Sequence, residues 1–257
     1  MKRIINFAKF SSVKIGGEHE VTVVDSIDDD VRDAVLIGGA NNILISPNPP
    51  KMAILSKKFD YINLNGDELE IGGASKSGKI FSFAKKHNIA GFEILQNIPG
   101  TLGGLVFMNA GLLGLSISDS LTHVLLARGW VPKSEIDFSY RHSGINEPIF
   151  GAKFKVKKGF LQSFADEINK KRSNQPKGAS FGSCFTNPQG DFAGRLIEAV
   201  GLKGHAIGGA KFSEKHANFL INFNNATFFD ATELIELAKR RVSESFGIEL
   251  KTEVVIL

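Results

Sequence analysis

The sequence has a single cysteine, Cys184, among its 257 residues. One thiol cannot form a disulfide within the chain, and it fits a reducing compartment. No apolar run approaches the roughly 18 residues that a membrane-spanning helix needs. No charged and apolar leader precedes the first expected strand. These absences predict a cytoplasmic protein with no part in the membrane.

The chain also lacks a strong charge of one sign. Its formal net charge is +4, with 31 Lys and Arg against 27 Asp and Glu. The longest basic runs are Lys170–Arg172 and Lys239–Arg241, and no basic stripe interleaves with aromatic residues. This pattern argues against a nucleic-acid partner and favours a mixed surface. A mild positive field would also suit anionic small molecules.

Glycine, by contrast, is abundant, with 27 residues. The segment 98–111 reads Ile-Pro-Gly-Thr-Leu-Gly-Gly-Leu-Val-Phe-Met-Asn-Ala-Gly, which a buried strand or helix interior would not tolerate. Such a loop can direct several backbone N–H groups at one phosphate, or it can be a plain turn between core strands. It is neither a G-x-G-x-x-G fingerprint nor a Walker loop.

A second glycine segment lies between two apolar runs, Val35–Ile37 and Ile43–Ile45. Its Gly-Gly-Ala-Asn-Asn sequence can be a bare turn or another phosphate clasp, because asparagine tolerates left-handed backbone and offers side-chain donors. Two such segments in one half of the chain indicate a long, phosphorylated ligand held at two places.

Hydrophobic periodicity predicts an α+β fold without a regular βαβ repeat. Short strands are expected at 20–24, 34–37, 43–45, 53–55, 61–64, 69–71 and 154–156, and helices at 77–87, 162–172 and 193–200. The 162–172 helix looks like a connector between domains. A last helix is expected to start at an Asp230 cap supported by Glu233 and to stop at Gly247. Its buried stripe is expected to consist of Leu234, Ile235, Ala238, Val242 and Phe246. A closing strand over 248–257 would place Glu253 opposite an apolar face formed by Ile248, Leu250, Val254 and Ile256.

Several ordered motifs resemble those of the UDP-N-acetylenolpyruvoylglucosamine reductase (MurB) family. They are Gly-Phe-Glu-Ile-Leu at 91–95, the glycine segment 98–111, Ser-Tyr-Arg-His-Ser at 139–143, Gly-Ser-Cys-Phe-Thr-Asn-Pro at 182–188, Gly-Leu-Lys-Gly at 201–204, Ile-Gly-Gly-Ala at 207–210 and His-Ala-Asn-Phe at 216–219. The resemblance runs from about Lys14 to the last residue.

This resemblance implies a bipartite FAD-binding domain of the vanillyl-alcohol-oxidase-like (PCMH) kind over 1–157, with subdomains of roughly 1–58 and 59–157. A smaller α/β substrate-binding domain would follow over 158–257. The implied activity is the NADPH-driven, FAD-dependent reduction of UDP-N-acetylglucosamine enolpyruvate to UDP-N-acetylmuramate, for peptidoglycan synthesis. No metal, nucleic acid or obligate protein partner is expected.

The resemblance also implies the site residues. The catalytic residues would be Arg141, which with Glu253 stabilises the developing enolate, and Ser183, which donates the proton. The cofactor would be bound by Gly38, Gly39, Asn41, Asn42, Ile98, Pro99, Gly100, Thr101, Gly103, Gly104, Asn109 and Gly111. The substrate would be contacted by Tyr140, Asn187, Lys203 and His216.

Taken alone, these residues leave other interpretations open. Arg141 and Lys203 can be surface residues, Ser183 and Asn187 turn residues, and Glu253 an exposed strand residue. Tyr140 and His216 can serve the core, and Cys184 can be a thiol nucleophile or a small buried residue. At the level of function, the alternatives are a flavin oxidase acting on alcohols and a nucleotide-binding module without catalysis.

The chain departs from the family pattern at three places. Ala40 stands before Asn41-Asn42 where the family more often has Gly-Ser-Asn, so one pyrophosphate contact is in doubt. Thr186 stands where lysine is common. The short segment between Arg141 and Ser183 is typical of the family type that lacks an extra subdomain and its tyrosine loop.

Overall fold

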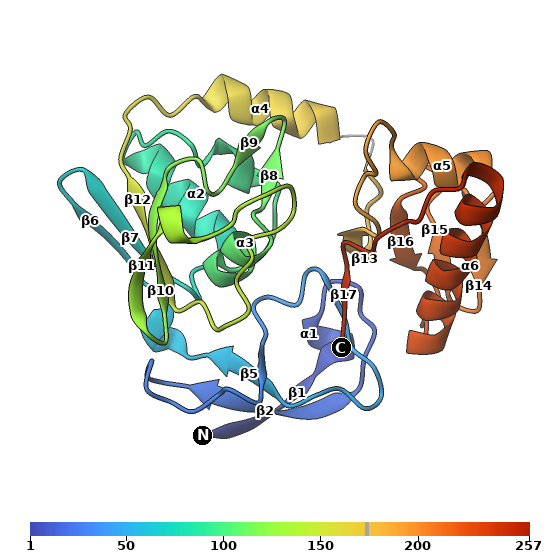
Figure 1. Ribbon diagram of the computed structural model, residues 1–257, viewed down its shortest axis with the longest axis horizontal. Coiled ribbons are helices and arrows are strands. Elements are labelled where there is room, and N and C mark those ends of the chain that lie inside the picture. The colour runs from blue at the N-terminus through green and yellow to red at the C-terminus, as the bar shows by residue number, and fades with distance from the viewer. Residues whose placement is uncertain (173–174) are drawn as a thin grey trace. The chain divides into compact units, whose positions relative to one another are not determined.

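A computed structural model describes residues 1–172 and 175–257 (Figure 1). The chain divides into two compact units, each assembled from three segments. The first unit comprises Met1–Arg3, Val21–Gly39 and Lys51–Ser173, and the second comprises Ile4–Glu20, Ala40–Pro50 and Asn174–Leu257. These limits differ from the functional boundary expected after residue 157, which stays a prediction.

The first unit is built around a five-stranded antiparallel sheet in the order β11-β10-β12-β7-β6. A second sheet has the order β1-β2-β5-β3, in which β2 and β3 run parallel to β5. Its strands β1 and β2 cross the limits given above, since residues 4–6 and 18–20 are counted with the second unit. A hairpin joins β8 and β9. The strands are β1 (Lys2–Asn6), β2 (Glu18–Val24), β3 (Val35–Leu36), β5 (Met52–Leu55), β6 (Ile62–Asn65), β7 (Glu68–Gly72), β8 (Gly111–Leu112), β9 (Leu115–Ser116), β10 (Leu121–Leu126), β11 (Gly129–Pro132) and β12 (Gly151–Lys155).

Three α-helices and three 3₁₀ turns belong to this unit. They are α2 (Ser77–Lys86), α3 (Leu102–Phe107), α4 (Gln162–Lys171), η1 (Lys57–Phe59), η2 (Glu93–Gln96) and η3 (Lys133–Glu135). α4 is more than the predicted connector, because its Ala165 and Ile168 are fully buried. Its start is held by the buried Glu93, whose carboxylate accepts from the Leu161 N–H at 3.0 Å.

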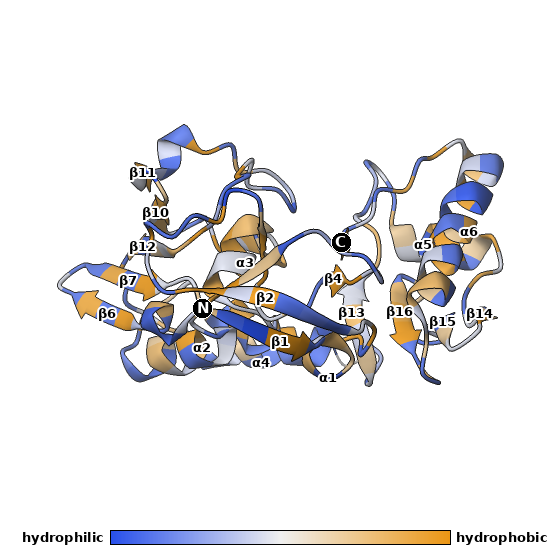
Figure 2. Cartoon of the chain, turned by 90° about the horizontal axis from the view of Figure 1, so that it is seen from below, coloured by the Kyte–Doolittle hydropathy of each residue, from blue (hydrophilic) through white to orange (hydrophobic). Residues whose placement is uncertain are grey.

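The second unit packs helices on a four-stranded antiparallel sheet in the order β13-β16-β15-β14. β16 is almost uniformly hydrophobic, whereas α6 alternates hydrophobic and hydrophilic residues (Figure 2). The strands are β4 (Ile43–Leu44), β13 (Ala179–Ser183), β14 (Ala206–Ile207), β15 (Ala210–Phe212), β16 (Phe219–Asn222) and β17 (Val255–Ile256), and the helices are α1 (Phe7–Phe10), α5 (Ala193–Ala199) and α6 (Phe228–Phe246).

The expected stripe of α6 is confirmed for the most part, since Leu234, Ile235, Ala238 and Val242 are fully buried. Phe246, the last expected member, is 41% exposed. The expected N-cap is wrong. Thr227 is the cap, and its hydroxyl accepts from the Asp230 N–H at 3.1 Å while the Asp230 carboxylate accepts from the Thr227 N–H at 2.9 Å. Asp230 thus accepts the second hydrogen bond of the capping box, for which the sequence predicts Glu233.

The expected strand over 248–257 is also wrong in extent, because only Val255–Ile256 forms β17, which runs parallel to β4. Leu250 and Val254 are buried as predicted, but Ile256 is 38% exposed. Instead of continuing a strand, residues 251–254 run beside 184–186, where Thr186 N–H donates to the Lys251 carbonyl at 2.9 Å. Pairing with residues far away in the sequence therefore determines which side chains of this segment face inward, and the alternation of a regular strand does not.

Candidate active site

The two glycine segments meet in the first unit at Gly38 and Thr101. An added Cβ at Gly38 would lie 2.3 Å from the Thr101 hydroxyl oxygen, closer than any side chain can approach. Only a glycine leaves room for this contact. This contact brings together two residues more than sixty positions apart, both of which are predicted to bind the cofactor.

Gly103 and Gly104 lie inside the short helix α3, although the sequence was interpreted as excluding a helix here. Gly103 donates its N–H to the Gly73 carbonyl at 2.9 Å, and Leu102 donates to the Ser75 carbonyl at 2.9 Å. A Cβ on Gly103 would lie 3.2 Å from the Ile149 carbonyl oxygen. These two amides are used inside the protein, so the glycine serves a close approach of α3 to its neighbours.

The remaining residues of these segments vary in exposure. Gly39, Asn41, Asn42, Ile98, Gly100 and Thr101 are half-buried, Pro99 and Gly104 are exposed, and Asn109 and Gly111 are buried. Gly111 opens β8, and a Cβ there would lie 2.5 Å from the Leu115 carbonyl oxygen.

Arg141 sits at the tip of a tight turn. Ser139 and His142 close the turn with reciprocal backbone hydrogen bonds of 2.9 and 3.2 Å, so that Tyr140 and Arg141 form the tip. Arg141 has a φ of +57°, a conformation that is unfavourable by roughly 1–2 kcal/mol for a residue with a Cβ. Its guanidinium carbon lies 5.0 Å from the centre of the exposed Tyr140 ring.

Arg172 is a cation that sequence reasoning missed. Burial, together with the nearby charge of Arg141, lowers the pKa of Arg172. The positive charges of two arginines repel each other, and an anionic ligand would offset that repulsion. The only signal in the sequence was the short basic run Lys170–Arg172, which resembled an ordinary solvated surface.

Ser183 lies at the end of a bulged strand in the second unit. The pairing of β13 with β16 shifts between Ser180 and Ser183, and Gly182 within the bulge has a φ of +87°. Its N–H donates to the Ser180 hydroxyl at 3.0 Å. Bulges of this kind redirect side chains beside functional sites.

Glu253 lies beside the same strand end. Its N–H donates to the carbonyl of Cys184, the residue after Ser183, at 2.8 Å. Its own carbonyl accepts from the Asn42 side-chain amide at 2.8 Å. Two of the three predicted catalytic residues, Ser183 and Glu253, are thus neighbours along paired backbone within one unit.

The buried Asn218 fixes the strand end that follows Ser183. Its side chain accepts from the Phe185 N–H at 2.9 Å and donates to the Phe185 carbonyl at 2.8 Å. Its own carbonyl accepts from the Cys184 N–H at 2.7 Å. Every polar group of the Asn218 side chain is therefore used in holding backbone.

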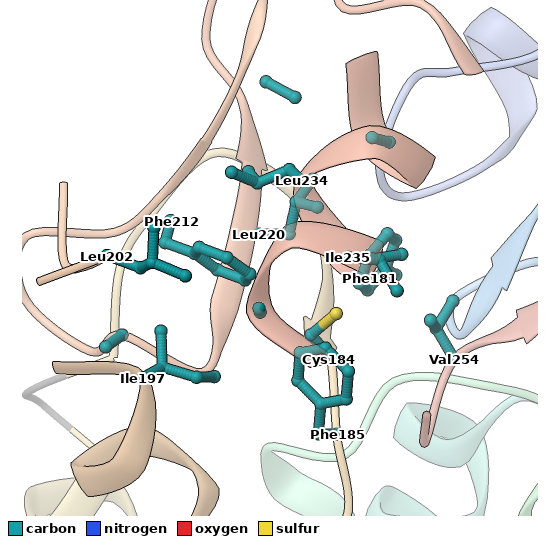
Figure 3. Close-up of a cluster of buried hydrophobic side chains, with 14 of the residues drawn as sticks. Phe181, Cys184, Phe185, Ile197, Leu202, Phe212, Leu220, Leu234, Ile235 and Val254 are labelled. Carbon is teal, nitrogen blue, oxygen red and sulfur yellow. The ribbon is translucent and has the colours of Figure 1, made fainter. Parts of the chain in front are cut away.

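Cys184 lies in the hydrophobic core with Phe181, Phe185 and Ile235 (Figure 3). The side chain is fully buried, and this burial raises the pKa of the thiol well above its ordinary value. A nucleophilic thiolate is disfavoured there. The structure favours the small-buried-residue interpretation of Cys184.

We expect the Cys184 thiol to be unreactive in the native protein. A thiol-specific reagent at pH 8 should label it no faster than the protein unfolds, because the thiolate is both desolvated and inaccessible. Labelling in denaturant should be complete within minutes, which provides the control. Fast stoichiometric labelling of the folded protein would contradict the burial described here.

The predicted substrate residues of the second unit make ordinary protein contacts. The Asn187 side chain accepts from the Ala193 N–H at 3.1 Å, ahead of α5. Lys203 forms an ion pair with Glu198 at 2.8 Å. The half-buried ring of His216 contacts Phe219, and burial lowers its pKa, which favours the neutral imidazole. Their contacts with substrate stay predictions.

Among residues 1–172 and 175–257, no group of three or more His, Cys, Asp or Glu residues is arranged to hold a metal ion. Within the same ranges, every helix is too short or too polar to cross a membrane.

The comparisons with known proteins agree on one class, the reductases of UDP-N-acetylenolpyruvoylglucosamine. A family model described as UDP-N-acetylenolpyruvoylglucosamine reductase, C-terminal domain, matches residues 174–257. Relatives carrying that enzyme name are found in Campylobacter jejuni (53% identical, covering 99% of this chain and 100% of the relative) and Bacillus subtilis (32% identical, covering 97% and 91%).

Similarity extends to a solved structure. The crystal structure of UDP-N-acetylenolpyruvylglucosamine reductase from Thermus caldophilus superposes with a TM-score of 0.87 at 27% identity, covering 100% of this chain and 99% of that one. The chain therefore belongs to the UDP-N-acetylenolpyruvoylglucosamine reductase family. Its 257 residues fit the shorter type of that family, and its fold is the α+β architecture expected from the sequence.

Proposed function

We propose that this protein reduces UDP-N-acetylglucosamine enolpyruvate to UDP-N-acetylmuramate, a step of peptidoglycan synthesis, with FAD as its cofactor and NADPH as the electron donor. The observation that carries the proposal is similarity over the whole chain, at 53% identity, to a relative with this enzyme name. The match covers the whole length of that relative, which supports carrying over its whole activity.

The residues present fit a bound FAD. Asn109 is 8% exposed, and its side-chain oxygen is a buried acceptor without a hydrogen-bond partner in the described residues. A buried acceptor of this kind needs a donor from a ligand or from water. We propose that the two glycine segments and Asn109 hold the cofactor.

FAD supplies the hydride chemistry when it is bound. The protein side chains then act on the substrate. Negative charge develops on the enolpyruvyl carboxylate when hydride is added to the vinyl C3, and a fixed guanidinium is suited to stabilise it. We assign this role to Arg141, and we assign the polarisation of the enol ether to Glu253. The half-buried Arg172 adds a second positive charge near Arg141.

Ser183 is assigned as the proton donor to C2 of the substrate. The bulge at Gly182 and the backbone pairing of Cys184 with Glu253 fix the main chain on both sides of Ser183. A hydroxyl carried on a fixed main chain can be directed at one substrate atom, which supports a role in general acid catalysis.

The cellular setting and the functional domains also belong to this proposal. We assign residues 1–157 to FAD binding and residues 158–257 to the substrate, and we place the protein in the cytoplasm. It would act there without an obligate protein partner or nucleic acid.

The test is anaerobic spectroscopy of the purified protein. The flavin absorption bands should bleach on addition of NADPH and return on addition of UDP-N-acetylglucosamine enolpyruvate, with no oxygen present. Rapid re-oxidation by oxygen but not by the enolpyruvate would favour an alcohol oxidase. A colourless protein that cannot be reconstituted with FAD would overturn the proposal.

A further inference from the structure

Asn109 connects the glycine segment to the turn that carries Arg141. Its side-chain N–H donates to the Ser139 carbonyl at 2.8 Å, across 30 positions in sequence. That carbonyl also accepts the His142 N–H that closes the turn. The Ser139 carbonyl oxygen therefore accepts two hydrogen bonds, one that closes the turn and one that ties the turn to the Asn109 side chain.

The turn has a strained tip that needs such support. Arg141, with its φ of +57°, adopts a conformation that is favourable for glycine and asparagine but not for arginine. Tyr140 beside it is 58% exposed, so packing of its ring contributes little to holding the tip. Strained residues persist where surrounding contacts determine their conformation, and the bond from Asn109 to the Ser139 carbonyl is such a contact at the base of this turn.

Asn109 is itself held firmly. It is buried, it follows α3, and its φ of +40° lies in the left-handed region that asparagine tolerates better than most residues. The two arms of its amide point to different partners. The N–H arm is bonded to the turn, and the oxygen arm is the buried acceptor that fits the cofactor.

We propose that Asn109 is a positioning residue that sets the place of Arg141 relative to the bound flavin. The inference rests on the proposed function, because it takes Arg141 to act on the substrate. Loss of the N–H arm should misplace the guanidinium without emptying the cofactor site, and displacement of a reacting group by about 1 Å can slow a reaction about 100-fold.

The main variant is Asn109→Asp, which keeps the size, the oxygen acceptor and the tolerance of left-handed backbone but removes the donor. In single-turnover experiments on the NADPH-reduced holoenzyme, we expect re-oxidation by UDP-N-acetylglucosamine enolpyruvate to slow between about 10- and 100-fold. Because the new carboxyl group is buried beside the Ser139 carbonyl, we expect a lower unfolding temperature and weaker FAD binding. Both half-reactions are therefore measured on protein saturated with FAD, where re-oxidation should slow by a larger factor than reduction by NADPH.

The matched control is Asn88→Asp. Asn88 also has a positive φ, of +55°. Its side-chain oxygen accepts from the Phe160 N–H at 3.0 Å, and aspartate retains that oxygen. This variant should behave as the unchanged protein. Asn109→Gly, which keeps the backbone conformation and removes both arms, serves if the aspartate variant does not fold.

A double-mutant cycle distinguishes positioning from a purely structural role. If Asn109 acts through Arg141, adding Asn109→Asp to an Arg141→Met variant should slow re-oxidation by less than about threefold more, since contacting residues are non-additive. Multiplication of the two rate effects in the double variant, or equal slowing of both half-reactions by Asn109→Asp with FAD saturating, would overturn the inference. An Arg141→Met variant with normal re-oxidation would instead refute the role of Arg141 in the proposed function.

Discussion

Replacing Ser183 with alanine is expected to remove most of the turnover while leaving the first half-reaction intact. The loss of a positioned general acid should slow flavin re-oxidation by the enolpyruvyl substrate by about 100- to 10,000-fold. Reduction of the flavin by NADPH should change little, because the hydroxyl acts on the second substrate. Stopped-flow absorbance measures both steps separately on one preparation.

Two further serine variants make this experiment specific. Ser183→Cys keeps a weak proton donor and should recover part of the re-oxidation rate. Ser243→Ala changes an exposed serine on α6 and should leave both half-reactions unchanged. If Ser183→Ala slows both half-reactions equally, the proton-donor assignment is wrong.

The second large effect is expected on stability, from Gly73→Ala. A Cβ at Gly73 would lie 2.5 Å from the Ile149 carbonyl oxygen and 3.0 Å from that of Phe150, so backbone must shift. We expect destabilisation of about 3 kcal/mol, at the upper end for overpacking. At about 2–4 °C per kcal/mol for a chain of this size, thermal unfolding should begin roughly 6–12 °C lower.

The same variant should also release FAD more readily, because Gly73 accepts the hydrogen bond that seats Gly103 of α3. Gly78→Ala is the matched control, since a Cβ at Gly78 in α2 meets nothing within 4 Å. That substitution should be neutral or stabilise by up to about 1 kcal/mol. Equal unfolding temperatures for the two variants would refute the close approach at Gly73.

Local sequence signals were sufficient where a segment's own residues decide its structure. The helix α6 could be predicted because its apolar stripe, its capping residues and Gly247 all lie within one stretch of chain. The cap was misplaced by three residues, since Thr227 and Asp230 both have the chemistry of a capping residue and only their geometry distinguishes them.

Local sequence patterns predicted the structure wrongly where contacts with residues far away in the sequence determine it. Gly103 was interpreted as incompatible with a helix, yet the approach of α3 to Gly73 and Ile149 is what requires a glycine there. Glu253 could not be placed by alternation, because its segment is held by pairing with Cys184 and Thr186. The bond from Asn109 to Ser139 joins two motifs that the sequence showed only as separate.

The composition of the second unit from three chain segments has a consequence for how the protein is made. Asn42 is synthesised early, but its side chain donates a hydrogen bond to the carbonyl of Glu253, which lies 211 positions later in the chain. At about 5–20 residues per second, this partner emerges roughly 10–40 s after Asn42. During that interval the short strand β4 lacks its pairing partner β17. The nascent chain therefore exposes the apolar residues of β4, to which a chaperone can bind.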